Sequence, residues 1–311
     1  MAERIGIVWN PTKVDESALR DAVGAAFADD AEVQWWQTSQ DDPGRSMAEA
    51  AVEAGCDVVV AVGGDGTVRV VAEALASVGD DAPRLGIVPR GTGNLLARNL
   101  GIPLGSIPKA LALIAAGHDR EIDMGWVRAD GGAAETGFLV MIGVGLDAHM
   151  LAETDDDLKD RAGWLAYVEA MGRALTAAET MDISLRVDEG EEQAVSGHTL
   201  LIGNCGAIQG GVTLLPDAVP DDGRLDLLLV SAESAAQWAR TLRAIVWDNG
   251  IRRLIGGDDE TVDTDAARHL TGERIRAWLS TPTAFEIDGE EAGDITGLEV
   301  RVQPGALRVL C

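Results

Sequence analysis

Residues Val58 to Leu75 read VVVAVGGDGTVRVVAEAL. The stretch opens with an unbroken apolar run, which is typical of a strand covered on both faces in a parallel sheet. Gly63, Gly64 and Gly66 follow, and the apolar pattern then resumes with helical spacing. Glycines let a backbone pass close to a ligand, and a helix start presents free N–H groups and a positive dipole end. The stretch therefore predicts a phosphate site at a strand-to-helix turn.

Two polar side chains in this turn need their own explanation. Asp65 would repel a phosphate unless it holds a divalent cation, orders a water on one, or takes a proton from a substrate hydroxyl. Thr67 can cap the helix and donate its hydroxyl to a phosphate oxygen. The alternative for the whole string is a tight turn in which the glycines serve geometry alone.

A second glycine loop follows the next predicted strand. Residues Ile87 to Asn99 read IVPRGTGNLLARN, so that Gly91, Thr92 and Gly93 again join a strand to a helix. Two such loops at the carboxyl ends of strands in one sheet suit a nucleotide in the crevice above them. Strands and helices alternate through about residue 120, which predicts an open layered α/β domain.

Beyond that point, short apolar runs bounded by turn residues predict a mostly β domain, with helical stretches near residues 164–177 and 234–247. We therefore expect two domains, residues 1–123 and 124–311, and leave open whether the last residues pack back on the first. The expected strands of the second domain are Met124 to Arg128, Gly137 to Val144, Ile183 to Val187, His198 to Gly203, Leu225 to Val230 and Ala284 to Ile287.

The balance of charge narrows the class of partner. The 311 residues include 52 acidic and 25 basic ones, for a formal net charge of -27. Such a chain should repel nucleic acid and, at low salt, anionic membrane surfaces. The acids are spread along the whole sequence, which favours a solubility coat suited to a high-salt cytoplasm. An ordinary acidic cytosolic protein is the alternative.

Cysteines and hydropathy point to the same compartment. Cys56, Cys205 and Cys311 form no CxxC pair, which indicates reduced thiols in a cytoplasm. Residues 1–10 show no secretory pattern. The longest nearly apolar run, Gly137 to Leu146, is about half a membrane span. Any contact with a membrane is therefore expected to be peripheral.

The two glycine loops resemble the motifs of a known family. GGDGT, followed about 25 residues later by P-x-GTxN, resembles the diacylglycerol kinase catalytic family, which includes bacterial and archaeal lipid kinases and sphingosine kinases and is related to NAD kinases. Further similarities extend in order down the chain: Asn10-Pro11, Thr38, the segment Gly143 to Ala148, the turn from Pro216 to Gly223, and Asp288-Gly289-Glu290.

The resemblance implies an ATP-dependent, Mg²⁺-requiring kinase that phosphorylates a lipid hydroxyl. It also implies an α/β nucleotide domain and a β-sandwich domain, with the active site in the cleft between them. The lipid would be presented at a membrane surface and would be diacylglycerol or a related glycerol or isoprenoid lipid. The nucleotide contacts carried over by the resemblance are Asn10, Pro11, Thr12, Thr38, Gly63, Gly64, Asp65, Gly66, Thr67, Gly91, Thr92 and Asn94.

The resemblance also assigns catalytic roles to acids of the motif Asp288-Gly289-Glu290. By resemblance Glu290 is the general base, with Asp288 beside it holding metal or water, and Asp65 serves the metal and the phosphates. Period-two alternation along a strand would point Asp288 and Glu290 to the same side. The alternative is an acidic surface turn.

A structural Mg²⁺ site is implied at Asp222, with the backbone carbonyls of Val219 and Arg224. An ordinary Asp-Gly turn explains Asp222 equally well. Asp147 either joins the metal network or caps a turn.

Two departures from the family pattern concern Arg69, where many members have Asn, and Leu95, where many have Asp. The change at Leu95 bears on substrate placement. Arg69 could reach a phosphate or pair with Glu73 one helical turn later.

Two rival functions remain open. One is an NAD kinase or another small-molecule kinase, because the GGDG core alone does not separate these enzymes. The other is a nucleotide-sensing or lipid-sensing protein without catalysis. A homodimer through sheet edges of the second domain is also left open.

Overall fold

The computed structural model describes residues 3–28, 31–145, 180–208, 213–231 and 267–311. The chain forms two compact units, each assembled from separate stretches. The first unit contains Met1–Met124, Pro220–Gly223 and Gln303–Cys311, and the second contains Gly125–Val219 and Arg224–Val302. The chain therefore passes from one unit to the other at four points. One lies within strand β5 (Asp119–Ala129), two lie at the ends of the short segment Pro220–Gly223, and one lies within strand β14 (Glu290–Leu310).

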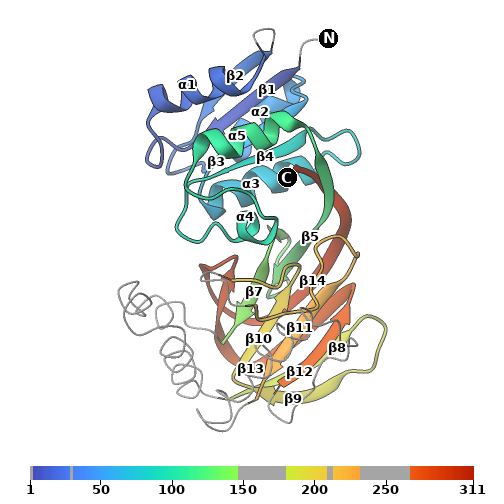
Figure 1. Cartoon of the computed structure of the whole chain (residues 1–311). Helices are drawn as coiled ribbons and strands as arrows, with labels where there is room; N and C mark the ends of the chain where they lie inside the picture. The colour runs from blue at the N-terminus through green and yellow to red at the C-terminus, as the bar shows by residue number, and fades with distance from the viewer. Residues whose placement is uncertain (1–2, 29–30, 146–179, 209–212, 232–266) are drawn as a thin grey trace, which may run out of the picture. The chain divides into compact units, whose positions relative to one another are not determined.

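The first unit is a parallel sheet covered by helices on both faces (Figure 1). Its strand order is β14–β4–β3–β1–β2, with Val309 of β14 paired to Leu85. Every residue of β3 is buried, as expected for the strand that opens the deciding stretch. The remaining strands of this sheet are β1 (Arg4–Trp9), β2 (Glu32–Gln37), β3 (Val58–Gly63) and β4 (Arg84–Pro89).

Two pairs of helices cover this sheet. Helices α1 and α5 share a buried core with Ile5 and Ile7 of β1. Gly6, between those two residues, faces the other way toward α2, where an added Cβ would lie 3.0 Å from the Cβ of Ala51. Successive residues of β1 therefore face opposite sides of the sheet, and a layer of helices covers each side. The helices are α1 (Glu16–Ala26), α2 (Arg45–Glu53), α3 (Asp65–Ala76), α4 (Leu95–Asn99) and α5 (Ile107–Ala116).

The second unit is built from antiparallel strands. The path β12–β11–β10–β7–β13–β14 is extended by β8 and β9 beside β13, and by β5 and β6 beside β14. Residues 275–279 of β13 pair with β8, whereas residues 285–287 pair with β7. A register shift between Trp278 and Thr283 separates these two halves, so one strand serves two parts of the sheet.

One apolar core fills the second unit. It combines inward positions of most of its strands, among them Phe138, Leu227 and Ile275, which are fully buried. The strands not yet bounded are β6 (Thr136–Phe138), β7 (Met141–Val144), β8 (Met181–Val187), β9 (Gln193–Gly197), β10 (Thr199–Gly203), β11 (Leu225–Val230), β12 (Ala267–Gly272) and β13 (Arg274–Ile287).

The expected change from an alternating α/β half to a mostly β half is confirmed, with differences in detail. The expected strand from Gly137 to Val144 is two strands, interrupted at Leu139 and Val140. Helix α3 begins at Asp65 with Gly64 as its N-cap, so the expected capping role of Thr67 was wrong. The helices expected near residues 164–177 and 234–247 lie outside the described residues.

No helix within the described ranges is long and apolar enough to cross a membrane.

Candidate active site

The two glycine loops lie side by side at one edge of the parallel sheet. Gly63 ends β3 and is the register partner of Pro89, which ends β4. The backbone N–H of Arg90 donates to the carbonyl of Gly63 at 2.7 Å, which holds the two loops together. The carboxyl edge of the sheet therefore presents two glycine loops and the start of helix α3, as the sequence predicted.

Glycine is required in the two loops because their backbones lie in direct contact. A Cβ on Gly91 would lie 2.7 Å from the Cα of Gly64, closer than real Cβ contacts allow. A Cβ on Gly63 would lie 2.7 Å from the hydroxyl oxygen of Thr67, which is itself buried. The glycines therefore bring the loops into contact and leave room for Thr67 beneath the turn.

The carboxylate of Asp65 joins the two loops. Its Oδ2 accepts the backbone N–H of Asn94 at 2.7 Å, and its Oδ1 accepts that of Leu95 at 2.6 Å. Asn94 has a left-handed backbone (φ 47°), and its side-chain amide bonds back to both the N–H and the carbonyl of Gly91. Asp65 thus satisfies the first free N–H groups of helix α4, a structural role that the sequence did not reveal.

The nucleotide-contacting residues predicted from the sequence before the first glycine loop lie at the same carboxyl edge of the sheet. Asn10 follows β1, its backbone N–H donates to Val62 at 3.0 Å, and its side-chain oxygen accepts from the N–H and hydroxyl of Thr12. Thr38 follows β2, is almost fully buried, and donates its N–H to Trp9 at 2.9 Å. The structure therefore gathers the predicted nucleotide-contacting residues at the ends of four adjacent parallel strands.

Of the two alternatives for Arg69, a phosphate contact or an ion pair with Glu73, the structure shows the ion pair. Its Nη1 lies 3.4 Å from Oε1 of Glu73, one turn later on α3. Glu73 is buried and is also bonded by the guanidinium of Arg45 from α2. This cluster ties the two helices together on the face of the sheet that they cover.

The turn that contains Asp222 belongs to the first unit, whereas Val219 and Arg224 belong to the second. The guanidinium of Arg224 donates to the carbonyl and hydroxyl of Thr271. Asp147 lies outside the described residues. Within the ranges that can be described, no three His, Cys, Asp or Glu side chains cluster as a metal site would require.

Asp123 is a buried carboxylate that sequence reasoning missed. Its two oxygens accept the backbone N–H groups of Gly223 at 2.7 Å and Gly305 at 2.8 Å, and its own N–H donates to Pro220. Burial raises the pKa of Asp123, and the charge of Asp222 raises it further, while the two N–H bonds lower it. The available signal was an acid between Ile122 and Met124, inside the buried stretch of β5 that runs from Ile122 to Val127.

Asp288 and Glu290 are separated by a hairpin turn, which corrects the expectation that they alternate along one strand. Strand β13 ends at Ile287, β14 begins at Glu290, and these two residues pair with each other. Asp288 (φ 50°) and Gly289 (φ 80°) are the two turn residues, both left-handed as in a type I′ hairpin. Glu290 is exposed and Asp288 is buried.

The buried carboxylate of Asp288 binds backbone. It accepts N–H groups from Leu139 at 2.9 Å, Val140 at 2.8 Å and Met141 at 3.0 Å. These are the residues at which β6 gives way to β7, so Asp288 fixes that interruption to the turn that carries Glu290. Its geometry is that of a positioning group within the second unit.

Comparison with known proteins agrees with this arrangement. The model of the diacylglycerol kinase catalytic domain matches residues 5–127, and the model of the YegS C-terminal NAD kinase beta sandwich-like domain matches residues 140–311. The second model covers more than half of the chain, so the chain belongs to the family of the YegS C-terminal NAD kinase beta sandwich-like domain, and its first part is similar to the diacylglycerol kinase catalytic domain. The expected fold class, an α/β domain followed by a β-sandwich domain, is thereby confirmed.

Two proteins named as lipid kinases match over nearly the whole chain. "Probable lipid kinase YegS" from Salmonella arizonae is 29% identical over 307 residues, covering 97% of this chain and 94% of that protein. The protein of the same name from Shigella boydii has the same identity and coverage. A solved structure of a diacylglycerol kinase from Bacillus anthracis superposes with a TM-score of 0.69 at 21% identity, covering 99% of this chain and 96% of that one.

Proposed function

We propose that the protein is an ATP-dependent lipid kinase that transfers the γ-phosphate to a lipid hydroxyl with the help of Mg²⁺. The observation that carries this proposal is the pair of glycine loops at the carboxyl edge of the first unit, closed on each other through Asp65. In this proposal residues 1–123 bind the nucleotide and residues 124–311 receive the lipid.

The donor set at this edge fits a polyphosphate. The backbone N–H groups at the start of α3 have no side-chain cap, the hydroxyl of Thr12 lies in the turn after β1, and Thr38 follows β2. Transfer of a phosphoryl group depends mainly on positioning and charge neutralisation, which such groups provide without a P-loop lysine. Mg²⁺ would supply further neutralisation of the phosphate charge, with Asp65 and Asp222 as the candidate carboxylates.

Glu290 is the proposed general base. It is exposed at the first position of β14, directly after a two-residue turn, so its carboxylate can accept a proton from a substrate hydroxyl. Asp288 is proposed to hold this turn in place, because its carboxylate is already engaged by three backbone N–H groups.

The decisive experiment offers labelled ATP and Mg²⁺ to the full-length protein with three acceptors: diacylglycerol in vesicles, isoprenoid glycerol lipids in vesicles, and NAD in solution. We expect label in the lipid fraction, and its loss in the Glu290→Gln variant. Label on NAD and on no lipid would identify an NAD kinase. Nucleotide binding without transfer to any acceptor would identify a sensing protein.

A further inference from the structure

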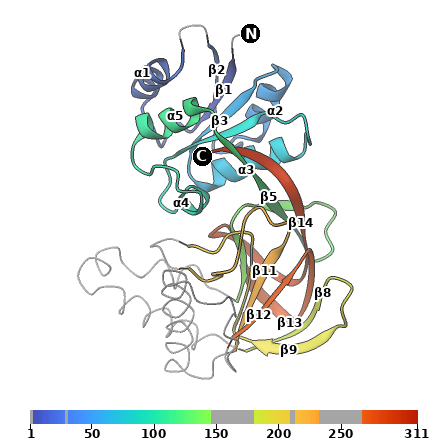
Figure 2. The same cartoon turned by 45° about the vertical axis from the view of Figure 1, so that its right-hand side comes forward.

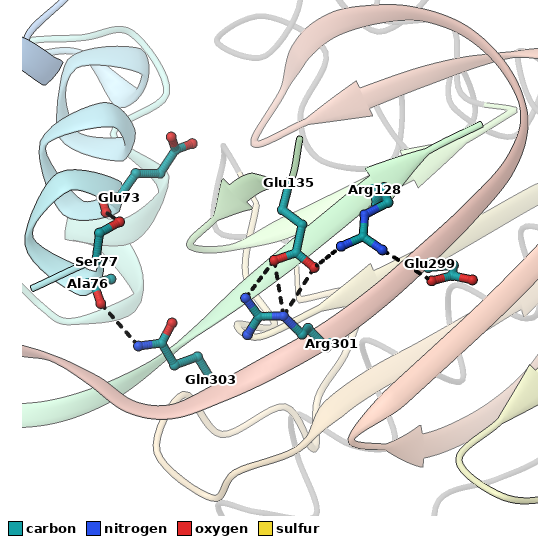
Figure 3. A network of polar contacts seen from close by, with 8 residues as sticks. All are labelled: Glu73, Ala76, Ser77, Arg128, Glu135, Glu299, Arg301 and Gln303. Atoms are coloured by element: carbon teal, nitrogen blue, oxygen red, sulfur yellow. Dashed lines mark hydrogen bonds and ion pairs between the residues drawn. The ribbon is translucent and has the colours of Figure 1, made fainter. Parts of the chain in front are cut away.

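The chain changes its pairing partners between strands β6 and β7 of the second unit. Strand β6 pairs with β5, whereas β7 lies between β10 and β13 (Figure 1). Before β6, Glu135 binds Arg301 through both oxygens, at 2.7 and 3.2 Å, and lies 3.2 Å from Arg128 (Figure 3). Leu139 and Val140, which we call the bend, belong to neither strand and are almost fully buried. Their backbone groups therefore need hydrogen-bond partners outside the strand ladders.

Asp288 binds the N–H groups of the bend. Its carboxylate accepts those of Leu139, Val140 and Met141, and its own backbone N–H donates to the carbonyl of Met141 at 2.9 Å. Asp288 belongs to the turn that joins β13 to β14, two strands that lie side by side (Figure 2). Because Glu290 directly follows that turn, its position is tied to the position of the bend.

The carbonyl groups of the bend are bound by Asn204 and Cys205, which directly follow β10. The backbone N–H groups of these two residues donate to the carbonyl of Val140, at 2.8 and 3.1 Å. The side-chain amide of Asn204 donates to the carbonyl of Leu139 at 3.3 Å, and the thiol of Cys205 lies 3.5 Å from the same oxygen. Both residues are 1% exposed. The bend is therefore held by its N–H groups from one side and by its carbonyls from the other.

The loop that carries these two residues is itself tightly packed. A Cβ on Gly203 would collide with Cδ1 of Leu215, and a Cβ on Gly206 would collide with the carbonyl oxygen of Leu215. The carbonyl of Gly206 accepts the N–H groups of Leu214 and Leu215, at 2.9 and 3.3 Å. Side chains that must hold a functional group in place are effective only when their own positions are fixed by packing, and this loop meets that condition.

We propose that Asn204, assisted by Cys205, is a positioning residue for Glu290. It fixes the carbonyls of the bend to the end of β10 while Asp288 binds the N–H groups, so the turn that carries Glu290 is held through two successive sets of hydrogen bonds. Proton transfer requires the base and the hydroxyl within hydrogen-bond reach, so a small displacement of the carboxylate lowers the rate. The inference rests on the proposed function in one respect, namely that Glu290 is the general base.

The test combines amide hydrogen exchange with steady-state kinetics on the full-length Asn204→Ala variant. Because the Leu139 carbonyl loses its amide donor, we expect the amides of residues 139–141 to exchange about tenfold faster than in the wild type. In the ATP–lipid assay, kcat should fall about 10- to 100-fold while the KM for ATP stays unchanged. Cys205→Ser keeps a donor beside Leu139 and should retain most of the kcat that Cys205→Ala loses.

Two variants of the same unit control for a general loss of packing. Thr199→Val changes a buried side chain at the start of β10, whose hydroxyl makes no hydrogen bond within the described part of the chain. Ile183→Val removes a buried methyl group on β8, which pairs with the half of β13 farther from the turn. Both should keep the wild-type kcat and the wild-type exchange at residues 139–141, even where Ile183→Val lowers the urea midpoint.

A double variant tests whether Asn204 and Asp288 act through the same bend. If they do, Asn204→Ala combined with Asp288→Asn should lose no more kcat than the more damaging single variant, because the bend is already released. Losses that multiply would show that the two residues act independently and would contradict the proposed route to Glu290.

Three further results would overturn the proposal. Unchanged exchange at residues 139–141 in Asn204→Ala would remove the link to the bend, whether or not the protein is a kinase. A loss of kcat no larger than that of Ile183→Val at equal urea midpoint would reduce Asn204 to a packing role. An unchanged kcat with a raised KM would make Asn204 a substrate contact. A wild-type protein that phosphorylates no acceptor would instead overturn the proposed function, and the exchange result would still decide whether Asn204 holds the Asp288 turn.

Discussion

Two acidic residues that the motifs single out are engaged by the backbone. Asp65 accepts the N–H groups of Asn94 and Leu95, and Asp288 accepts those of three consecutive residues around Val140. The sequence placed Asp65 in the loop beside glycine, where the structure makes it the first residue of α3, and it placed Asp288 on an alternating strand rather than in the hairpin turn. It could not supply their partners, because these lie about 30 and 150 residues away and are fixed only by the packing of strands. A motif therefore specifies the residue type needed in a turn better than the role of its side chain.

Asp288→Asn should destabilise the protein by about 2–3 kcal/mol, because the new amide places its own N–H groups against backbone N–H donors. Asn tolerates the left-handed backbone of this position, so the change isolates the lost hydrogen bonds. Urea unfolding gives the free energy, and the ATP–lipid assay gives the activity, which should fall as the turn carrying Glu290 loosens. Glu290→Gln is the matched control, with activity lost and stability within about 0.5 kcal/mol of the wild type. An Asp288→Asn variant that is fully stable but inactive would instead show direct participation in the chemistry.

At the scale of elements, the local sequence pattern was informative wherever strands and helices that are consecutive in the chain also pack against each other. The strand-to-helix units around the two glycine loops were predicted to within a few residues, because βαβ connections are local and β3 is apolar throughout. The second unit was predicted less completely. Strands β9, β12 and β14 were missed, and the long β13 was reduced to its last residues, since its outward positions are polar and Arg-rich.

The contact between the two glycine loops is the element-scale feature that most directly controls the candidate site. Gly91→Ala would place a Cβ 2.7 Å from the Cα of Gly64, so the loops must separate. We expect a cost of about 1–3 kcal/mol in unfolding free energy and a clear rise in the KM for ATP. Gly24→Ala is the control, because nothing lies within 4 Å of the added methyl group in helix α1. That change should stabilise by about 0.5–1 kcal/mol and leave the KM unchanged. An unchanged KM in Gly91→Ala would separate this loop from nucleotide binding.

For the whole molecule, the sequence average and the structure give different information. The net charge of -27 describes the chain as a whole, whereas the strand registers of the second unit place Arg186, Arg274, Arg276 and Arg301 on one face together with Glu299. Composition does not reveal this arrangement, because it depends on which positions of three strands share a side. The same average charge nevertheless makes a firm prediction about stability, since charges of one sign spread over a compact chain repel one another.

Raising the KCl concentration from low values to about 1 M should increase the unfolding temperature, because the Debye length falls to roughly 3 Å and the mutual repulsion of the acids is screened. Calorimetry at several salt concentrations measures this. Glu49→Gln/Glu53→Gln supplies the matched variant, since these exposed acids are four residues apart on α2, where Glu53 also meets the negative end of the helix dipole. It should be more stable than the wild type by about 0.5–1 kcal/mol at low salt, and the difference should vanish as salt rises. An unfolding temperature that is flat or falls with salt would mean that the acidic coat is already offset by local ion pairs, and would remove the reason to regard it as an adaptation to high salt.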